Sequence, residues 1–80
     1  MANKKLIEKM IKEAEGRIVQ AKEDIEASQI MERFSRRKVL TKPGQGDQML
    51  LEITKKINTL KVAISTDEEF LAFLNEIKNE

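Results

Sequence analysis

The sequence contains no cysteine and no histidine, and its only aromatic residues are three phenylalanines. Without cysteine the chain forms no disulfide and offers no thiolate. Without histidine it lacks the side chain most often used as a general base or a zinc ligand. Only hydroxyl, lysine and carboxylate groups remain for chemistry. We therefore expect a protein that is not an enzyme and that binds no metal and no cofactor.

Proline occurs once and glycine three times, and no apolar run approaches the about 20 residues that a membrane-spanning helix needs. The first residues are followed by charges instead of the apolar stretch of a secretory signal. Apolar residues form 40% of the chain and charged residues 36%, which is typical of solvated helices that carry aliphatic stripes. We expect an all-α cytoplasmic protein that does not bind membranes.

In the N-terminal part, apolar residues recur at alternating steps of four and three, as in a heptad repeat. We call this set the Ile/Ala seam; it comprises Ile7, Ile11, Ala14, Ile18, Ala21 and Ile25. After Ser28 the apolar residues define a second stripe, as a three-residue stammer would produce; this stripe comprises Ala27, Ile30, Met31 and Phe34. The pattern predicts one long helix over about 3–38 with two apolar faces.

The segment 41–47 contains the single proline and two glycines, and predicts a turn. Asp47 is a suitable N-cap for a second helix over about 47–64, whose stripe comprises Leu50, Ile53, Ile57, Leu60 and Ile64. Thr66 and Glu69 have the spacing of a capping box, which predicts a third helix over about 67–79. The whole chain, 1–80, forms a single helical domain.

The two shorter helices laid end to end match the long one, so we predict a helical hairpin of three helices. Such a hairpin has no closed core, and an 80-residue monomer buries only about 60–65% of its unfolded surface. A compact monomer would leave Ile7, Ile11 and Ile18 uncovered, so we predict a homo-oligomer that associates through the Ile/Ala seam. The alternative is a monomeric four-helix bundle in which the long helix breaks at Gly16.

The net charge of +1 conceals a segregation along the chain. Residues 1–34 are neutral, residues 35–61 carry seven basic against two acidic groups, and residues 62–80 carry one basic against five acidic groups. Guanidinium groups and the free amides of a helix N-terminus suit phosphates and carboxylates. The predicted ligand-binding residues are therefore Arg33, Arg36, Arg37, Lys38, Lys42, Gly44 and Gly46. The alternative is an ordinary solvated turn, whose basic side chains complement helix carbonyls.

The run from Arg33-Phe34 through Lys42-Pro43-Gly44-Gln45 into an amphipathic helix resembles a loop of small helical phage proteins that sequester cyclic nucleotides. The resemblance covers about 20 residues, and the tyrosine and histidine expected in that loop are missing, so it implies only a phosphate-bearing ligand. DNA is not expected as a partner, because the predicted third helix is acidic and Phe34 is the only aromatic residue near the basic segment.

These observations favour a non-enzymatic, oligomeric helical protein that binds another protein as an inhibitor, adaptor or regulator, of the kind common in phages and mobile elements. The alternative is sequestration of a phosphate-bearing ligand, a nucleotide or cyclic oligonucleotide, or accessory binding of nucleic acid, at the basic loop 33–48.

Overall fold

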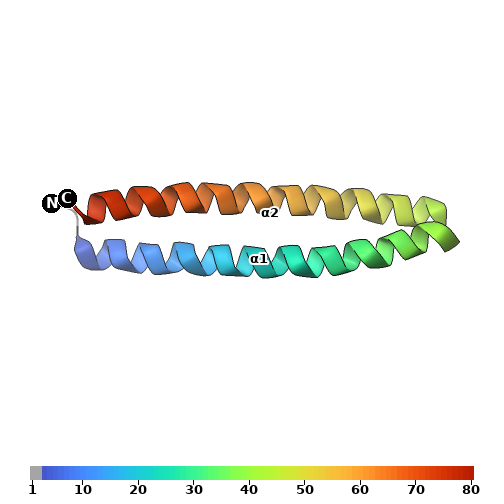
Figure 1. Cartoon of the computed structure of the whole chain (residues 1–80), viewed down its shortest axis with the longest axis horizontal. Helices are drawn as coiled ribbons and strands as arrows, with labels where there is room; N and C mark the ends of the chain where they lie inside the picture. The colour runs from blue at the N-terminus through green and yellow to red at the C-terminus, as the bar shows by residue number, and fades with distance from the viewer. Residues whose placement is uncertain (1–2) are drawn as a thin grey trace.

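The computed structural model describes residues 3–80, which form two long antiparallel helices (Figure 1). Helix α1 spans Lys4–Thr41 and helix α2 spans Pro43–Lys78, and only Lys42 separates them. The beginning of α1 and the end of α2 lie at the same end of a rod that measures 61 × 14 × 12 Å. The expected all-α class and the hairpin are confirmed.

The predicted third helix is not a separate element. Helix α2 continues through Thr66, whose hydroxyl donates to the carbonyl of Val62 at 3.0 Å in a bond typical of a helix interior. Residues 47–80 contain neither proline nor glycine, so nothing in the backbone forces a break. A capping box stabilises a helix start by only about 1 kcal/mol, which is less than several turns gain by continuing in register along α1.

The predicted turn over 41–47 is also shorter than expected. Pro43 is the first residue of α2, where the missing N–H costs nothing because the first helical N–H groups have no partner within the helix. Gly44 and Gly46 therefore lie inside the first turn of α2. Asp47 is a helical residue and does not cap α2.

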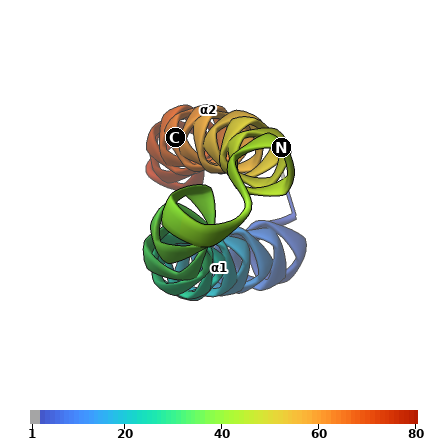
Figure 2. The same cartoon turned by 90° about the vertical axis from the view of Figure 1, so that its right-hand side faces the viewer.

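One uninterrupted heptad pattern faces inward along each helix, and every residue in it is buried or half-buried. On α1 it comprises Ile7, Ile11, Ala14, Ile18, Ala21, Ile25, Ser28, Glu32, Ser35 and Val39. On α2 it comprises Gly46, Leu50, Ile53, Ile57, Leu60, Ile64, Asp67, Leu71, Leu74 and Lys78. Viewed from the turn, both helices rotate counter-clockwise as they recede (Figure 2), which is the left-handed supercoil that a heptad repeat imposes.

The predicted stammer after Ser28 is wrong. The inward face of α1 continues through Ser28, Glu32 and Ser35, while Ile30 and Phe34 are 66% and 51% exposed. The Ser35 hydroxyl donates to the carbonyl of Met31 at 2.9 Å, so this buried polar group is satisfied within its own helix. The small side chains of Ser28 and Ser35 preserve the close packing against α2, whereas a shift to the apolar stripe would break the register.

The Ile/Ala seam faces α2 of the same chain. Ile7, Ala14 and Ile18 are buried, and Ile11, Ala21 and Ile25 are half-buried. The premise that one chain cannot cover this seam is therefore wrong, because the uninterrupted α2 runs along its whole length. Helix α1 also continues through Gly16, so the predicted alternative of a break at that residue does not occur.

At the turn, backbone hydrogen bonds continue up to and directly after Lys42, and the backbones of the two helices approach each other closely at Gly46. The Lys42 amide donates to the carbonyl of Lys38 at 2.6 Å, and the Gly46 amide donates to the carbonyl of Lys42 at 3.0 Å. A Cβ atom at Gly46 would lie 2.7 Å from both Cα and Cγ2 of Val39. Glycine is therefore required here for space, and its φ is negative.

Candidate functional site

The basic side chains near the turn point to different sides of α1. The guanidinium of Arg36 lies 3.6 Å from the carboxylate of Glu32, one turn earlier. The ammonium of Lys38 lies over the ring of Phe34, 5.8 Å from its centroid. Arg36 and Lys38 are two residues apart and thus about 200° apart around the helix. The predicted anion site is therefore not assembled by these two residues.

Arg33 and Arg37 do lie together. With Ile30 and Phe34 they line an open depression of about 300 Å³, which we call the outer groove. Its four residues lie on the face of α1 opposite Ser28 and Ser35, and therefore away from α2. All four are exposed, and within residues 3–80 neither arginine is part of an ion pair. The outer groove thus presents a row of two apolar side chains, Ile30 and Phe34, beside a row of two guanidinium groups.

The turn contributes less to a site than predicted. Gly46 is buried against Val39 and its amide is already bonded to Lys42, so this residue has a packing role. Lys42 and Gly44 are exposed, and a Cβ atom at Gly44 would meet nothing within 4 Å. Sequence reasoning attributed the two glycines to one ligand site, but only the tertiary register distinguishes them.

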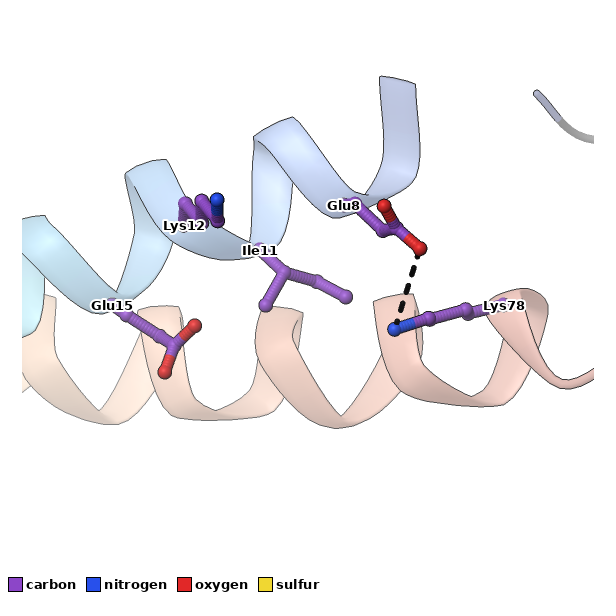
Figure 3. Close-up of a pocket in the computed structure, with 5 residues that line it drawn as sticks. All are labelled: Glu8, Ile11, Lys12, Glu15 and Lys78. Atoms are coloured by element: carbon purple, nitrogen blue, oxygen red, sulfur yellow. Dashed lines mark ion pairs between the residues drawn. The ribbon is translucent and has the colours of Figure 1, made fainter. Parts of the chain in front are cut away.

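A second depression, of about 250 Å³, lies at the opposite end of the rod (Figure 3). Its lining consists of Glu8, Ile11, Lys12, Glu15 and Lys78. The Lys78 ammonium is 3.8 Å from the Glu8 carboxylate, and Ile11 points toward α2 beside this pair. The ion pair between Lys78 and Glu8 links the two helices at this end of the rod. Because the lining carries both positive and negative groups, the depression does not favour a ligand of either charge.

An ion pair that sequence reasoning missed joins the middle of α1 to α2. Arg17 donates from Nη2 to Oδ1 of Asp67 at 2.9 Å and from Nε to the same oxygen at 3.2 Å. The hydrogen bond that Arg17 donates to the Asp67 carboxylate raises the pKa of the Arg17 guanidinium above its usual value. Asp67 is the charged residue at the inward heptad position between Ile64 and Leu71, and a charge at such a position was the signal that could have revealed the ion pair.

Together these contacts define the register of the hairpin. Arg17 pairs with Asp67, Glu8 with Lys78, and Val39 contacts Gly46, so residue numbers at one level of the rod add up to between 84 and 86. By this register, Ile11 is level with Leu74 and Ser35 with Leu50. Each inward residue of α1 therefore meets an inward residue of α2.

In the described part of the chain, no three potential ligand side chains gather closely enough to hold a metal ion. Neither of the two helices has a stretch apolar enough, at sufficient length, to cross a membrane.

No protein-family model matches this chain, and neither a curated protein nor a solved structure matches it. Its function must therefore be argued from its own surfaces.

Proposed function

We propose that this chain is a non-enzymatic binding protein that regulates another protein by docking an acidic amphipathic helix in the outer groove. The observation that supports this is the exposure of Ile30 and Phe34 beside the guanidinium groups of Arg33 and Arg37. Large apolar side chains exposed beside charges of one sign are typical of recognition surfaces.

The chemistry of the outer groove selects its partner. Arginine forks bind carboxylates through paired hydrogen bonds, and the apolar floor favours a leucine or isoleucine side chain. Arg33 and Arg37 are one helical turn apart, about 6 Å, which matches carboxylates at a similar spacing on a partner helix. A helix that carries one apolar stripe bordered by glutamates would satisfy both requirements.

A phosphate-bearing ligand is the second candidate, because the same two guanidinium groups can flank one phosphate. The outer groove is open, however, and the amide of Gly46 is already used inside the turn. Enclosure and convergent donors, which small anions need for tight binding, are weak here. The geometry therefore favours a protein partner.

The test is a fluorescence-anisotropy titration with a synthetic helical peptide that has one leucine stripe flanked by glutamates. The Arg33→Glu/Arg37→Glu variant should weaken binding by at least about tenfold, because repulsion replaces both ion pairs. The Lys4→Glu/Lys5→Glu variant changes the net charge equally at the far end of the rod and should bind like the wild type.

Calorimetry with inorganic phosphate and a cyclic dinucleotide, at low and physiological salt, distinguishes the second candidate. Heat from these ligands that the arginine variant abolishes, without binding of the peptide, would replace the proposal with anion sequestration. Equal binding of the peptide to both charge variants would refute a role for the outer groove.

A further inference from the structure

The two long flanks of the hairpin differ in chemistry. One flank consists of the residues that directly follow every second inward residue, as Glu8 follows Ile7 and Glu15 follows Ala14. All ten of these residues are polar and exposed. This polar flank comprises Glu8, Glu15, Lys22, Gln29, Arg36, Asp47, Thr54, Lys61, Glu68 and Asn75. No apolar residue occupies these ten positions, and on this side of the chain that the structure describes, apolar side chains occur only further out, at Val19, Leu40, Leu51 and Ala72.

The opposite flank contains all three phenylalanines of the chain and every methionine among residues 3–80. We call it the Met/Phe flank; it comprises Leu6, Met10, Met31, Phe34, Met49, Phe70, Phe73 and Ile77. Four of these, Met10, Met49, Phe70 and Ile77, are half-buried beside the inward pattern, and the other four are exposed. In an antiparallel pair the corresponding flank positions of both helices lie on the same side, so the two helices together present two apolar clusters, separated along the rod by the charged residues Arg17, Asp24 and Lys56.

We propose that a second copy of this chain covers the Met/Phe flank, with its turn at the opposite end, to form an antiparallel four-helix bundle. Within the described residues of one chain, only Ile7, Ala14, Ile18, Ile57 and Leu74 are buried apolar residues. Such a core is small for a domain of this length. A two-layer hairpin that packs against its own copy gains the closed core it lacks.

The Met/Phe flank is divided into two clusters whose positions fit this arrangement. Met31, Phe34 and Met49 lie about 10–17 Å from Lys42 along the rod, at 1.5 Å per helical residue. The other members, from Leu6 to Phe70, lie about 42–54 Å from Lys42 by the same measure. In a copy turned end for end on a rod of 61 Å, each terminal cluster falls level with the turn cluster of its partner.

The charges favour the same orientation. Residues 35–61, next to the turn, carry a net charge of +5, and residues 62–80 carry −4. With turns at opposite ends, the acidic part of α2 in one copy lies level with the basic turn region of the other. With turns at the same end, like charges would lie level and repel.

The available area is also sufficient. The whole face, which includes the two apolar clusters and the charged middle between them, is 61 Å long and 14 Å wide, and its projected area of about 850 Å² is close to the 800 Å² per partner of a standard interface. The outer groove is left open, because Ile30, Arg33 and Arg37 lie on the far side of α1. Only Phe34 borders both surfaces, so variants that test self-association leave Phe34 unchanged.

Sedimentation equilibrium of the full chain at tens of micromolar tests the proposal. The wild type should have the mass of two chains of 9.2 kDa, and Met31→Glu/Phe73→Glu should have the mass of one. Val19→Glu/Val62→Glu is the matched control, because it replaces two exposed apolar residues outside the Met/Phe flank and should stay dimeric. Circular dichroism shows whether each variant keeps its helices.

A single-chain mass for the wild type would overturn the proposal, as would equal dissociation of both variants. The absence of cysteine from the natural chain allows the orientation to be tested separately. Mixed Met31→Cys and Phe73→Cys chains, treated with a short bis-maleimide, should give covalent heterodimers of the two variants. Crosslinks only between identical variants would refute the antiparallel arrangement.

Discussion

The half of the hairpin near the termini and the half near the turn use their apolar residues differently. Near the termini, Ile7, Ile11 and Ile18 of α1 point inward and meet α2. Near the turn, Ser28 and Ser35 occupy the equivalent inward positions, while Ile30 and Phe34 point outward. The first half uses these isoleucines to close the hairpin. In the second half, Ile30 and Phe34 are available for contacts with other molecules.

This difference separates stability from binding along one rod. Apolar burial is the main favourable term in folding, so the half that buries isoleucines and leucines contributes most of the stability of the hairpin. The half with serines inside contributes less, and its exposed Ile30 and Phe34 line the outer groove. Docking in the outer groove therefore depends on the half that the hairpin itself stabilises least, whereas the Met/Phe flank has members in both halves.

The largest expected effect comes from truncating the most buried side chain of the terminal half. Leu74 is 1% exposed, so Leu74→Ala should lower the free energy of unfolding by about 2–5 kcal/mol. Ile53 is half-buried in the turn half, level with Glu32, and Ile53→Ala should cost less than half as much. Urea unfolding followed by circular dichroism measures both. Equal losses would mean that the two halves contribute alike.

An intermediate effect is expected at the turn. Gly46→Ala would place a methyl group against the Val39 backbone, which cannot yield as a flexible side chain can, so we expect a loss of about 1–3 kcal/mol. Gly44 is helical with open space around it, and Gly44→Ala should raise stability by a few tenths to about 1 kcal/mol. Thermal unfolding of the two variants gives the comparison. A stabilising Gly46→Ala would contradict the close approach.

Much of the fold could be predicted from the sequence because its strongest signals are periodic. The steps of three and four from Ile7 to Ile25 and from Leu50 to Ile64 indicated which face of each helix is apolar, but the seam of α1 was assigned to contacts between chains, and it packs on α2 of the same chain instead. What failed were local signals that tertiary packing overrode. The capping box at Thr66 and the apolar stripe after Ser28 each favour a different local structure, but both are outweighed by the packing gained when the two helices stay in register over their whole length.

The candidate site was harder to predict, for a physical reason. The spacing of Arg33 and Arg37 was enough to place them on one face, but a helix also carries Arg36 and Lys38 to other faces. A list of nearby basic residues therefore overstated their convergence. The packing role of Gly46 depends on which residue of α1 lies opposite, and no local pattern contains that information. Ligand binding by these residues stays a prediction.

The smallest expected effect tests the comparison most directly, because it exchanges alanine and serine at one buried position in each half. Ala14 and Ser35 are both fully buried at equivalent positions of the heptad pattern. Ser35→Ala removes a hydroxyl whose acceptor, the Met31 carbonyl, lies in the helix interior and keeps its backbone partner. It should therefore raise stability by a few tenths of a kcal/mol through better helix propensity.

Ala14→Ser adds an oxygen to an enclosed apolar layer and should lower the free energy of unfolding by about 0.5–1 kcal/mol. The two sites are far apart, so the changes in the double variant should add. Urea unfolding of all three variants against the wild type measures these changes. If Ser35→Ala proves as destabilising as Ala14→Ser, the serine contributes specifically to packing and the turn half is not the weaker one. Opposite signs at the two positions would show that the turn half retains a polar interior at the expense of stability, as expected for a region that serves binding.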